Sequence, residues 1–164
     1  MRALALIGPP GAGKTAVGRL VAERRGVRFA DLDESVAARH GDLDEFVLDN
    51  GAALLAERTL DVLRDELSVG GVVAVSSLVT GGEAAYAVLV GADVVYLASD
   101  LAHTFGRSGM NAPQPPSMFG ARARWKELLD ARDPGYRRLA TAVVDVGELD
   151  IAGVADAVES ALHG

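Results

Sequence analysis

The chain has no cysteine and few aromatic residues: none of its 164 residues is Cys, and 5% are Phe, Trp or Tyr. The lack of cysteine excludes disulfides, thiolate metal sites and cysteine nucleophiles together. At this length folding buries roughly 70% of the surface of the unfolded chain, so a hydrophobic core can hold the fold without crosslinks. We therefore expect one domain over residues 1–164.

Long apolar runs and an excess of positive charge are also missing. No run reaches the ~18 residues of a membrane span, and the apolar start at 3–7 leads into a glycine-rich turn instead of a signal-peptide cleavage site. Sixteen bases against 23 acids give a formal charge of −7. We expect a cytoplasmic protein that binds neither nucleic acid nor membrane, while local donors still permit a phosphate ligand.

Short apolar runs alternate with longer amphipathic stretches, which predicts a parallel sheet flanked by helices. Strands are expected at 3–7, 27–30, 72–75, 94–97 and 142–146. Helices are expected at 14–25, 35–39, 43–48, 52–67, 84–89, 119–131 and 151–162. The predicted fold class is α/β, with three layers around a five-stranded parallel sheet. In such a sheet, ligands bind outside the carboxyl ends of the strands.

Residues 8–15 read GPPGAGKT and match the phosphate-binding pattern G-x-x-x-x-G-K-[ST]. Glycines let the backbone turn its N–H groups inward, and the following helix adds the positive end of its dipole. Lys14 can then reach the β- and γ-phosphates, and the Thr15 hydroxyl can hold Mg²⁺. Because an apolar strand precedes the motif and an amphipathic helix follows it, we expect a purine nucleoside triphosphate with Mg²⁺ as the ligand.

Two acids close the second predicted strand, Asp31 and Asp33, with one residue between them. Strand alternation would place both on the same side, near the P-loop. One carboxylate could hold the water shell of Mg²⁺ while the other orients or deprotonates a substrate hydroxyl. The alternative is that Asp33 caps a helix beginning at Glu34. Beside a P-loop, we favour catalysis.

The order and spacing of the motifs resemble shikimate kinase over nearly the whole chain. These motifs are the P-loop, Asp31-Leu32-Asp33, Asp49-Asn50-Gly51, the strand at 94–97 and Pro134-Gly135-Tyr136-Arg137-Arg138. The resemblance implies a monomeric P-loop kinase fold, with an acceptor-binding helical region at about 33–60 and a lid at about 108–120. It also implies transfer of the γ-phosphate of ATP to the 3-hydroxyl of shikimate or to a related small polyol.

The resemblance also implies roles for individual residues. Lys14, Asp33 and Arg137 match catalytic positions, where Asp33 activates the attacking hydroxyl and Arg137 grips the acceptor carboxylate. Thr15 and Asp31 match the positions that hold Mg²⁺. The nucleotide would contact Gly11, Ala12, Gly13, Lys14, Thr15, Ala16 and Arg107, the last of which would lie against adenine.

Three departures from the family pattern fall in the acceptor site. Ala56 stands where a helical arginine would bind the substrate, and Arg58 lies about 200° further around the helix. Residues 76–78 read Ser-Ser-Leu in place of a triple glycine, and Gln114 replaces the lid arginine. Between Gly109 and Gly120 there is no Lys or Arg.

These departures leave three hypotheses open. The first is a kinase that acts on shikimate poorly or on another small polyol. The second is a nucleotide-binding protein with little transfer activity. The third is another P-loop kinase class, such as a nucleoside monophosphate or gluconate-type kinase, but the arginine-free stretch Asn111–Ser117 disfavours it.

Overall fold

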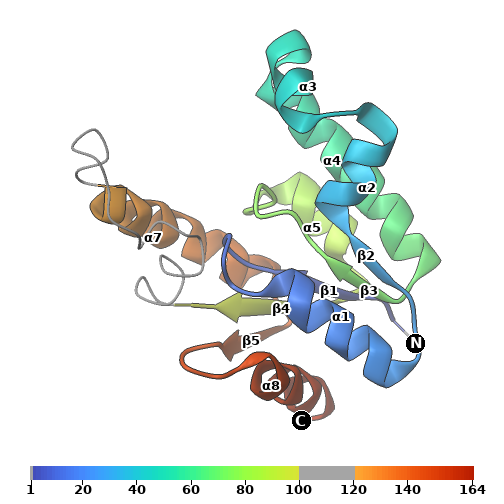
Figure 1. Cartoon of the computed structure of the whole chain (residues 1–164), viewed down its shortest axis with the longest axis vertical. Coiled ribbons are helices and arrows are strands. Elements are labelled where there is room, and N and C mark those ends of the chain that lie inside the picture. The colour runs from blue at the N-terminus through green and yellow to red at the C-terminus, as the bar shows by residue number, and fades with distance from the viewer. Residues whose placement is uncertain (1, 100–120) are drawn as a thin grey trace.

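Five parallel strands form the centre of the molecule (Figure 1). The computed structural model describes residues 2–99 and 121–164, and only the backbone of 121 and 122. The strands are β1 (Leu4–Ile7), β2 (Phe29–Asp31), β3 (Val72–Ala74), β4 (Asp93–Ala98) and β5 (Ala142–Asp145). They lie in the order β2-β3-β1-β4-β5, and every neighbouring pair is parallel. The predicted α/β class and five-stranded parallel sheet are confirmed, with strand bounds shifted by at most two residues.

Helices cover both faces of this sheet. On one face lie α1 (Lys14–Arg25) and α8 (Ile151–His163), which contact each other. The other face carries α4 (Ala52–Val69), α5 (Glu83–Leu89) and α7 (Ala121–Leu139). With α2 (Leu32–His40) and α3 (Leu43–Asn50), helix α4 forms an arm that projects beyond the sheet (Figure 1). We call residues 32–69 the α2–α4 arm.

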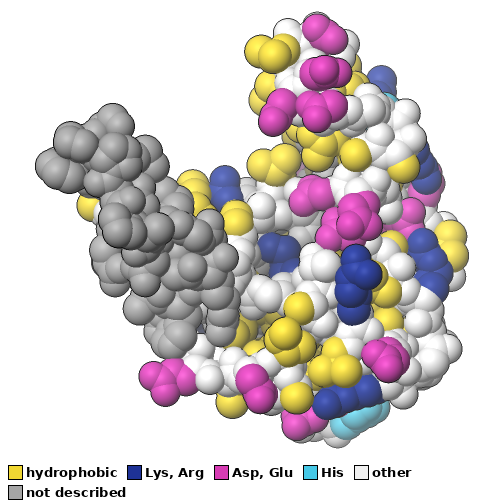
Figure 2. All heavy atoms as spheres, in the orientation of Figure 1, with side chains coloured by type: hydrophobic (Ala, Val, Ile, Leu, Met, Phe, Trp, Pro, Cys, Tyr) yellow, Lys and Arg dark blue, Asp and Glu magenta, His cyan; other side chains and the backbone are white. Residues whose placement is uncertain are grey.

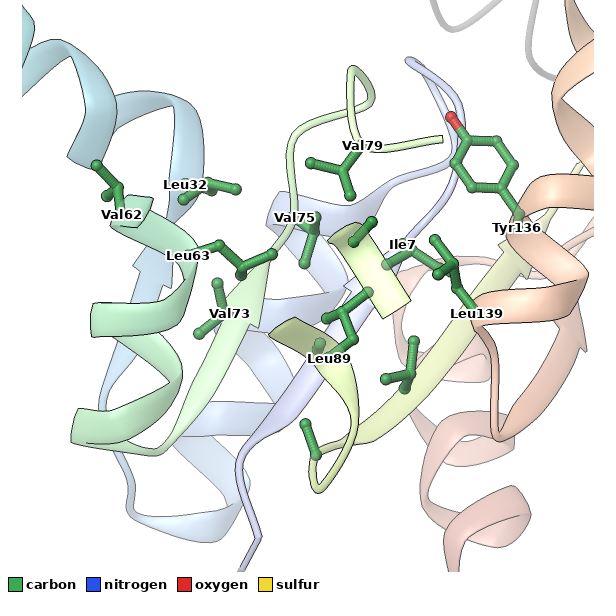
Figure 3. Packing of buried hydrophobic residues seen from close by; sticks show 14 of the residues in the cluster. Ile7, Leu32, Val62, Leu63, Val73, Val75, Val79, Leu89, Tyr136 and Leu139 are labelled. Atoms are coloured by element: carbon green, nitrogen blue, oxygen red, sulfur yellow. The ribbon is translucent and has the colours of Figure 1, made fainter. Parts of the chain in front are cut away.

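The core is divided by the sheet into two apolar clusters. Leu4 and Leu6 of β1 face the α1 and α8 side, whereas Ile7 faces the other, since consecutive strand residues point to opposite faces. Figure 3 shows the second cluster, where Ile7 lies among Leu63 of α4, Leu89 of α5 and Tyr136 of α7. Burial on both faces explains why the strands read as continuous apolar runs. In the described part of the chain, no helix is long and apolar enough to cross a membrane.

Two helices differ from the sequence prediction. Helix α2 begins at Leu32 because the Asp31 side chain caps it, accepting the N–H of Glu34 at 3.3 Å. The expected strand alternation through Asp33 is therefore wrong, because Asp33 lies in the first turn of the helix. Helix α7 was predicted to end at 131, yet it runs through Pro134 to Leu139.

The loop after β3 lies very close to α7 at Gly135. A Cβ atom on Gly135 would lie 1.9 Å from the carbonyl oxygen of Thr80, a distance that no side chain permits. One residue later, the buried Tyr136 hydroxyl donates a hydrogen bond to the carbonyl oxygen of Ser77 at 3.1 Å. Helix α7 is thus fixed against the residues that follow β3, at the carboxyl edge of the sheet.

Candidate active site

The P-loop connects β1 to α1 and curls tightly above the sheet. Gly8 has a φ of 149°, and a Cβ there would lie 2.8 Å from the carbonyl oxygen of Leu97. Gly13 precedes α1 in the left-handed conformation, and no side chain caps the helix. The first amides of α1 therefore have no capping acceptor, which is the arrangement that binds an anion at a helix N-terminus.

Lys14 folds back over this loop. Its Nζ donates hydrogen bonds to the carbonyl oxygens of Gly8 at 2.5 Å and Pro9 at 3.0 Å. Burial lowers the pKa of Lys14 to about 8, although the carboxylates of Asp33 and Asp31 act in the opposite direction. The ammonium group is held by neutral carbonyls alone, so a phosphate oxygen is a stronger acceptor than its present partners.

Thr15 and Asp31 bring two oxygens together across the sheet edge. The Thr15 Oγ1 donates a hydrogen bond to Asp31 Oδ2 at 2.8 Å, although 16 residues separate them. A hydroxyl and a carboxylate are oxygen ligands of the kind that Mg²⁺ accepts while keeping several waters. The residues present therefore fit a magnesium ion bound beside the nucleotide phosphates.

A cavity of about 430 Å³ opens in front of these groups. It is lined by Pro10, Gly11, Gly13, Lys14, Thr15, Ala16, Asp31, Asp33, Ala74, Val75 and Ser77. The structure thus brings Lys14, Asp31 and Asp33 to one cavity, even though Asp33 arrives from the first turn of α2 instead of from a strand.

A second cavity, of about 570 Å³, lies on the other side of the start of α1. Its lining is mostly apolar: Ala12, Gly13, Ala16, Val17, Val146, Leu149, Asp150, Ile151, Ala152 and Val154. Sequence reasoning missed the part contributed by residues 146–154. The available signal was their position directly after β5, because the ends of parallel strands meet at the ligand-binding edge. Arg107, which the sequence pattern assigned to adenine, lies outside the described residues.

Arg137 does not line either of these cavities. Its exposed guanidinium pairs with Asp133, with 2.7 Å between Nε and Oδ2, and lies 5.7 Å from the centre of the Tyr96 ring. This pairing lowers the pKa of the Asp133 carboxyl, against the effect of its own partial burial. The contacts of Arg137 are therefore with Asp133 on its own helix and with Tyr96 on β4.

Arg132 is the α7 cation that acts on the P-loop. It hydrogen-bonds to the Tyr136 side chain, and its positive charge helps to lower the pKa of Lys14. Arg132 lies one helical turn before Tyr136, which is about 6 Å along the axis of α7. Sequence reasoning missed Arg132. The signal was its i, i+4 spacing from a tyrosine that the motif already contained.

Helix α4 places Ala56 and Arg58 in different surroundings. Ala56 lines a small cavity of about 110 Å³ next to the loop after β3. Arg58 does not line it, and its Nη1 lies 3.4 Å from Oδ2 of Asp61 on the same helix. Gln114 and the lid predicted at 108–120 lie outside the described residues.

The fold and the site together define a P-loop kinase: a five-stranded parallel sheet, a glycine-rich phosphate loop with its lysine, and an aspartate pair in the same cavity. Residues 10–163 match the family model described as shikimate kinase. The chain belongs to the shikimate kinase family, whose members are ATP-dependent kinases, as its motif order indicated.

Individual relatives support this assignment. The chain is 40% identical over 141 residues to a shikimate kinase from Salinispora arenicola, covering 85% of this chain and 84% of the relative. It is 41% identical over 145 residues to a shikimate kinase from Thermobifida fusca, and the match covers 87% of this chain and 84% of the relative. A solved shikimate kinase from Acinetobacter baumannii in complex with shikimate matches with a TM-score of 0.87 and 25% identity, over 99% of this chain and 93% of that one.

The fold alone is shared more widely. A gluconokinase from Sinorhizobium meliloti matches with a TM-score of 0.66 at 16% identity, over 99% of this chain and 91% of that one. Since that identity is low, the likeness extends to the arrangement of the elements only. The third hypothesis from the sequence, another P-loop kinase class such as a nucleoside monophosphate or gluconate-type kinase, gains no support from this shared fold.

Proposed function

We propose that the protein transfers the γ-phosphate of ATP to a hydroxyl group of shikimate or of a related small polyol. The observation that carries this proposal is the meeting of Lys14 with Asp31 and Asp33 in one cavity in front of the P-loop. A cation for the phosphates and a carboxylate for the acceptor hydroxyl are the two groups that phosphoryl transfer to an alcohol requires.

The nucleotide is proposed to lie along the P-loop. Its purine would occupy the apolar cavity between Val17 and Leu149, and its phosphates would meet the backbone of residues 11–16. Lys14 would exchange its two carbonyl acceptors for phosphate oxygens. Thr15 and Asp31 would hold Mg²⁺, which, when bound, reduces the negative charge of the phosphates.

Asp33 is proposed to accept the proton of the attacking hydroxyl. As that oxygen forms its bond to the γ-phosphorus, the bond from phosphorus to the oxygen bridging to the β-phosphate breaks, and ADP leaves with that oxygen. A second positive charge is proposed to come from α7, which carries Arg132, whose charge acts on Lys14, and Arg137, the residue that the resemblance assigns to the acceptor carboxylate.

The remaining expectations belong to the same proposal. The α2–α4 arm would hold the acceptor, in agreement with the helical region expected at about 33–60, and residues 108–120 would act as the lid. The enzyme would work as a cytoplasmic monomer, binding neither nucleic acid nor membrane. A second candidate, nucleotide binding with little transfer, is favoured by one observation: Ala56 puts no cation on the wall beside the site.

The proposal is tested by ADP release from ATP and Mg²⁺ with shikimate as acceptor. Asp33→Asn should lower acceptor-dependent turnover by at least about 100-fold, because general-base catalysis contributes at least that much. Asp44→Asn, which changes an exposed acid in the first turn of α3, is the matched control and should leave turnover unchanged. If Asp33→Asn retains full turnover, the proposed base is wrong. If ATP binds and no alcohol stimulates turnover, the second candidate replaces the first.

A further inference from the structure

Helices α5 and α7 border a cavity of about 810 Å³, which we call the α5–α7 groove. This volume lies in the range of about 300–1,000 Å³ that is typical of small-molecule sites. None of its lining residues lines the cavity in front of the P-loop. They are Thr80, Gly81, Gly82, Glu83, Tyr86, Ala131, Gly135, Arg138 and Leu139.

The base of the groove is formed by closely packed backbone and one buried side chain. A Cβ atom on Gly81 would lie 3.2 Å from the Cα of Gly135, and one on Gly135 would lie 1.9 Å from the carbonyl oxygen of Thr80. Leu139 adds a hydrocarbon surface that is only 5% exposed. Because the glycines bring no side chains into the space above them, the groove is already formed without a ligand.

Helix α7 brings a positive charge to this groove. It contributes residues 131, 135, 138 and 139, whose spacing places them on one face of the helix. Arg138 is exposed, and within residues 2–99 and 121–164 it makes no hydrogen bond or ion pair. Its neighbour Arg137 differs, since it pairs with Asp133. Arg138 therefore presents an unpaired cation to the groove.

Helix α5 brings the opposite charge. Glu83 and Tyr86 are three positions apart, so their side chains are neighbours on the helix surface. Both are exposed, and Glu83 has no ion pair in the described part of the chain. A carboxylate beside an aromatic ring attracts an ammonium group, both by its charge and by the negative face of the ring.

Glu83 and Arg138 line the same cavity, yet these two described residues do not pair with each other. A molecule that carries both charges can therefore bridge them. The end of the α2–α4 arm is different, because Figure 2 shows acidic side chains gathered there, among them Asp42, Asp44 and Glu45. Such a cluster attracts cations alone, whereas the groove suits a ligand with one charge of each sign.

We propose that the α5–α7 groove binds a small zwitterion with an apolar body, of the α-amino acid class. The ligand carboxylate pairs with Arg138, and its ammonium group pairs with Glu83 beside the ring of Tyr86. The hydrocarbon side chain of the ligand rests on Ala131 and Leu139. This site goes beyond the proposed phosphoryl transfer and does not depend on it.

The test uses L-leucine and two analogues that each lack one of its charges. Isocaproate has no ammonium group, and isoamylamine has no carboxylate. Each compound is titrated by calorimetry into the protein with ADP and Mg²⁺ present, so that the P-loop is occupied. We expect L-leucine to bind at least about fivefold more tightly than either analogue, because each analogue loses one charge-assisted contact. Failure of L-leucine to bind, or equal binding of all three compounds, would overturn the inference.

Two variants assign the two charges of the ligand. Glu83→Gln should weaken L-leucine binding about fivefold without weakening isocaproate, which has no ammonium group for Glu83 to bind. Arg138→Gln should weaken L-leucine binding by a similar factor without weakening isoamylamine, which has no carboxylate. Both side chains are exposed, so neither change removes a buried contact.

Glu23→Gln and Arg24→Gln are the matched controls. They make the same two changes on α1, which covers the other face of the sheet, and should leave L-leucine binding unchanged. Equal weakening in the controls and in the groove variants would refute a site between α5 and α7. Turnover of ATP and shikimate in Glu83→Gln is measured separately: if it is retained while L-leucine binding is lost, the groove is distinct from the active site. Loss of turnover and of L-leucine binding together would contradict a separate site.

Discussion

The two sides of the active site satisfy their polar groups in opposite ways. On the P-loop side, α1 starts without a capping side chain, and Lys14 is bonded only to the carbonyl oxygens of its own loop. On the acceptor side, the hydroxyls of Thr59 and Ser76 are already bonded within the wall. The difference is that the P-loop side keeps backbone amides and a lysine ready for an anion, whereas these two hydroxyls on the other side already have partners.

The largest expected effect is on the P-loop side. Lys14→Ala should lower the turnover number by about 10³-fold or more, because it removes the cation that meets the transferred phosphoryl group. ATP affinity, measured by calorimetry, should fall as well. Lys126→Ala is the control, since that exposed lysine pairs with Asp130 on the surface of α7. Unchanged ATP binding in Lys14→Ala would show that the P-loop assignment is wrong.

The next effect distinguishes two arginines of α7. Arg132→Ala should lower kcat/KM by about 100-fold, because the positive charge that acts on Lys14 from α7 is lost. Arg137→Ala should change kcat/KM by less than about threefold and leave the free energy of unfolding nearly unchanged, since its ion pair with Asp133 is exposed. Kinetics and thermal unfolding of both variants provide the measurement. The reverse order of effects would restore the role that the sequence motif gave to Arg137.

A third effect follows from the pKa of Lys14, which burial lowers to about 8. Above that pH the free protein holds a neutral lysine, so nucleotide affinity should fall roughly tenfold per pH unit. A bound phosphate favours the charged form, and binding at pH 8.5 should therefore take up protons. Calorimetry in buffers of different ionisation enthalpy measures this uptake. Lys14→Arg should abolish both the uptake and the pH dependence, and their persistence in that variant would point to another group.

The smallest effect concerns the hydrogen bond between Tyr136 of α7 and Ser77 in the loop after β3. Tyr136→Phe removes the hydrogen bond to the Ser77 carbonyl and should cost about 1 kcal/mol of the free energy of unfolding, measured by urea titration. Because Arg132 also loses its contact with the Tyr136 hydroxyl, activity should fall less than in Arg132→Ala, which removes the cation itself. Tyr86→Phe, at a tyrosine 55% exposed on α5, is the control and should cost nothing measurable. A loss in both variants would show that the effect is not due to this bond.

Local features of the chain predicted the nucleotide side well. The P-loop string determines its own backbone shape, because Gly8 and Gly13 permit conformations that other residues resist. Helix α1 begins and ends where its amphipathic pattern predicted. Asp31 and Asp33 were correctly grouped near the P-loop, although Asp33 lies in a helix instead of continuing the strand and the helix cap is Asp31.

The acceptor side depended on tertiary packing and was harder to predict. Helix α7 passes through Pro134, a residue that normally costs a helix interior about 3 kcal/mol. Burial of Tyr136 and Leu139 against the sheet offsets that cost, and no local rule shows this. Without the full helix, the turn that holds Arg132 and Tyr136 could not be located. The apolar cavity after β5 likewise joins residues more than 100 positions apart in the chain.

The close approach at Gly135 has a consequence for how the enzyme can change. The separation between α7 and the loop after β3 is set by the absence of a single methyl group, because a Cβ would overlap the Thr80 carbonyl oxygen. Any side chain there would push α7 outward and carry Arg132 away from Lys14. Gly135 therefore acts as a spacer of fixed thickness: the loop after β3 and the helix that carries Arg132 and Tyr136 can lie this close together only while residue 135 has no side chain.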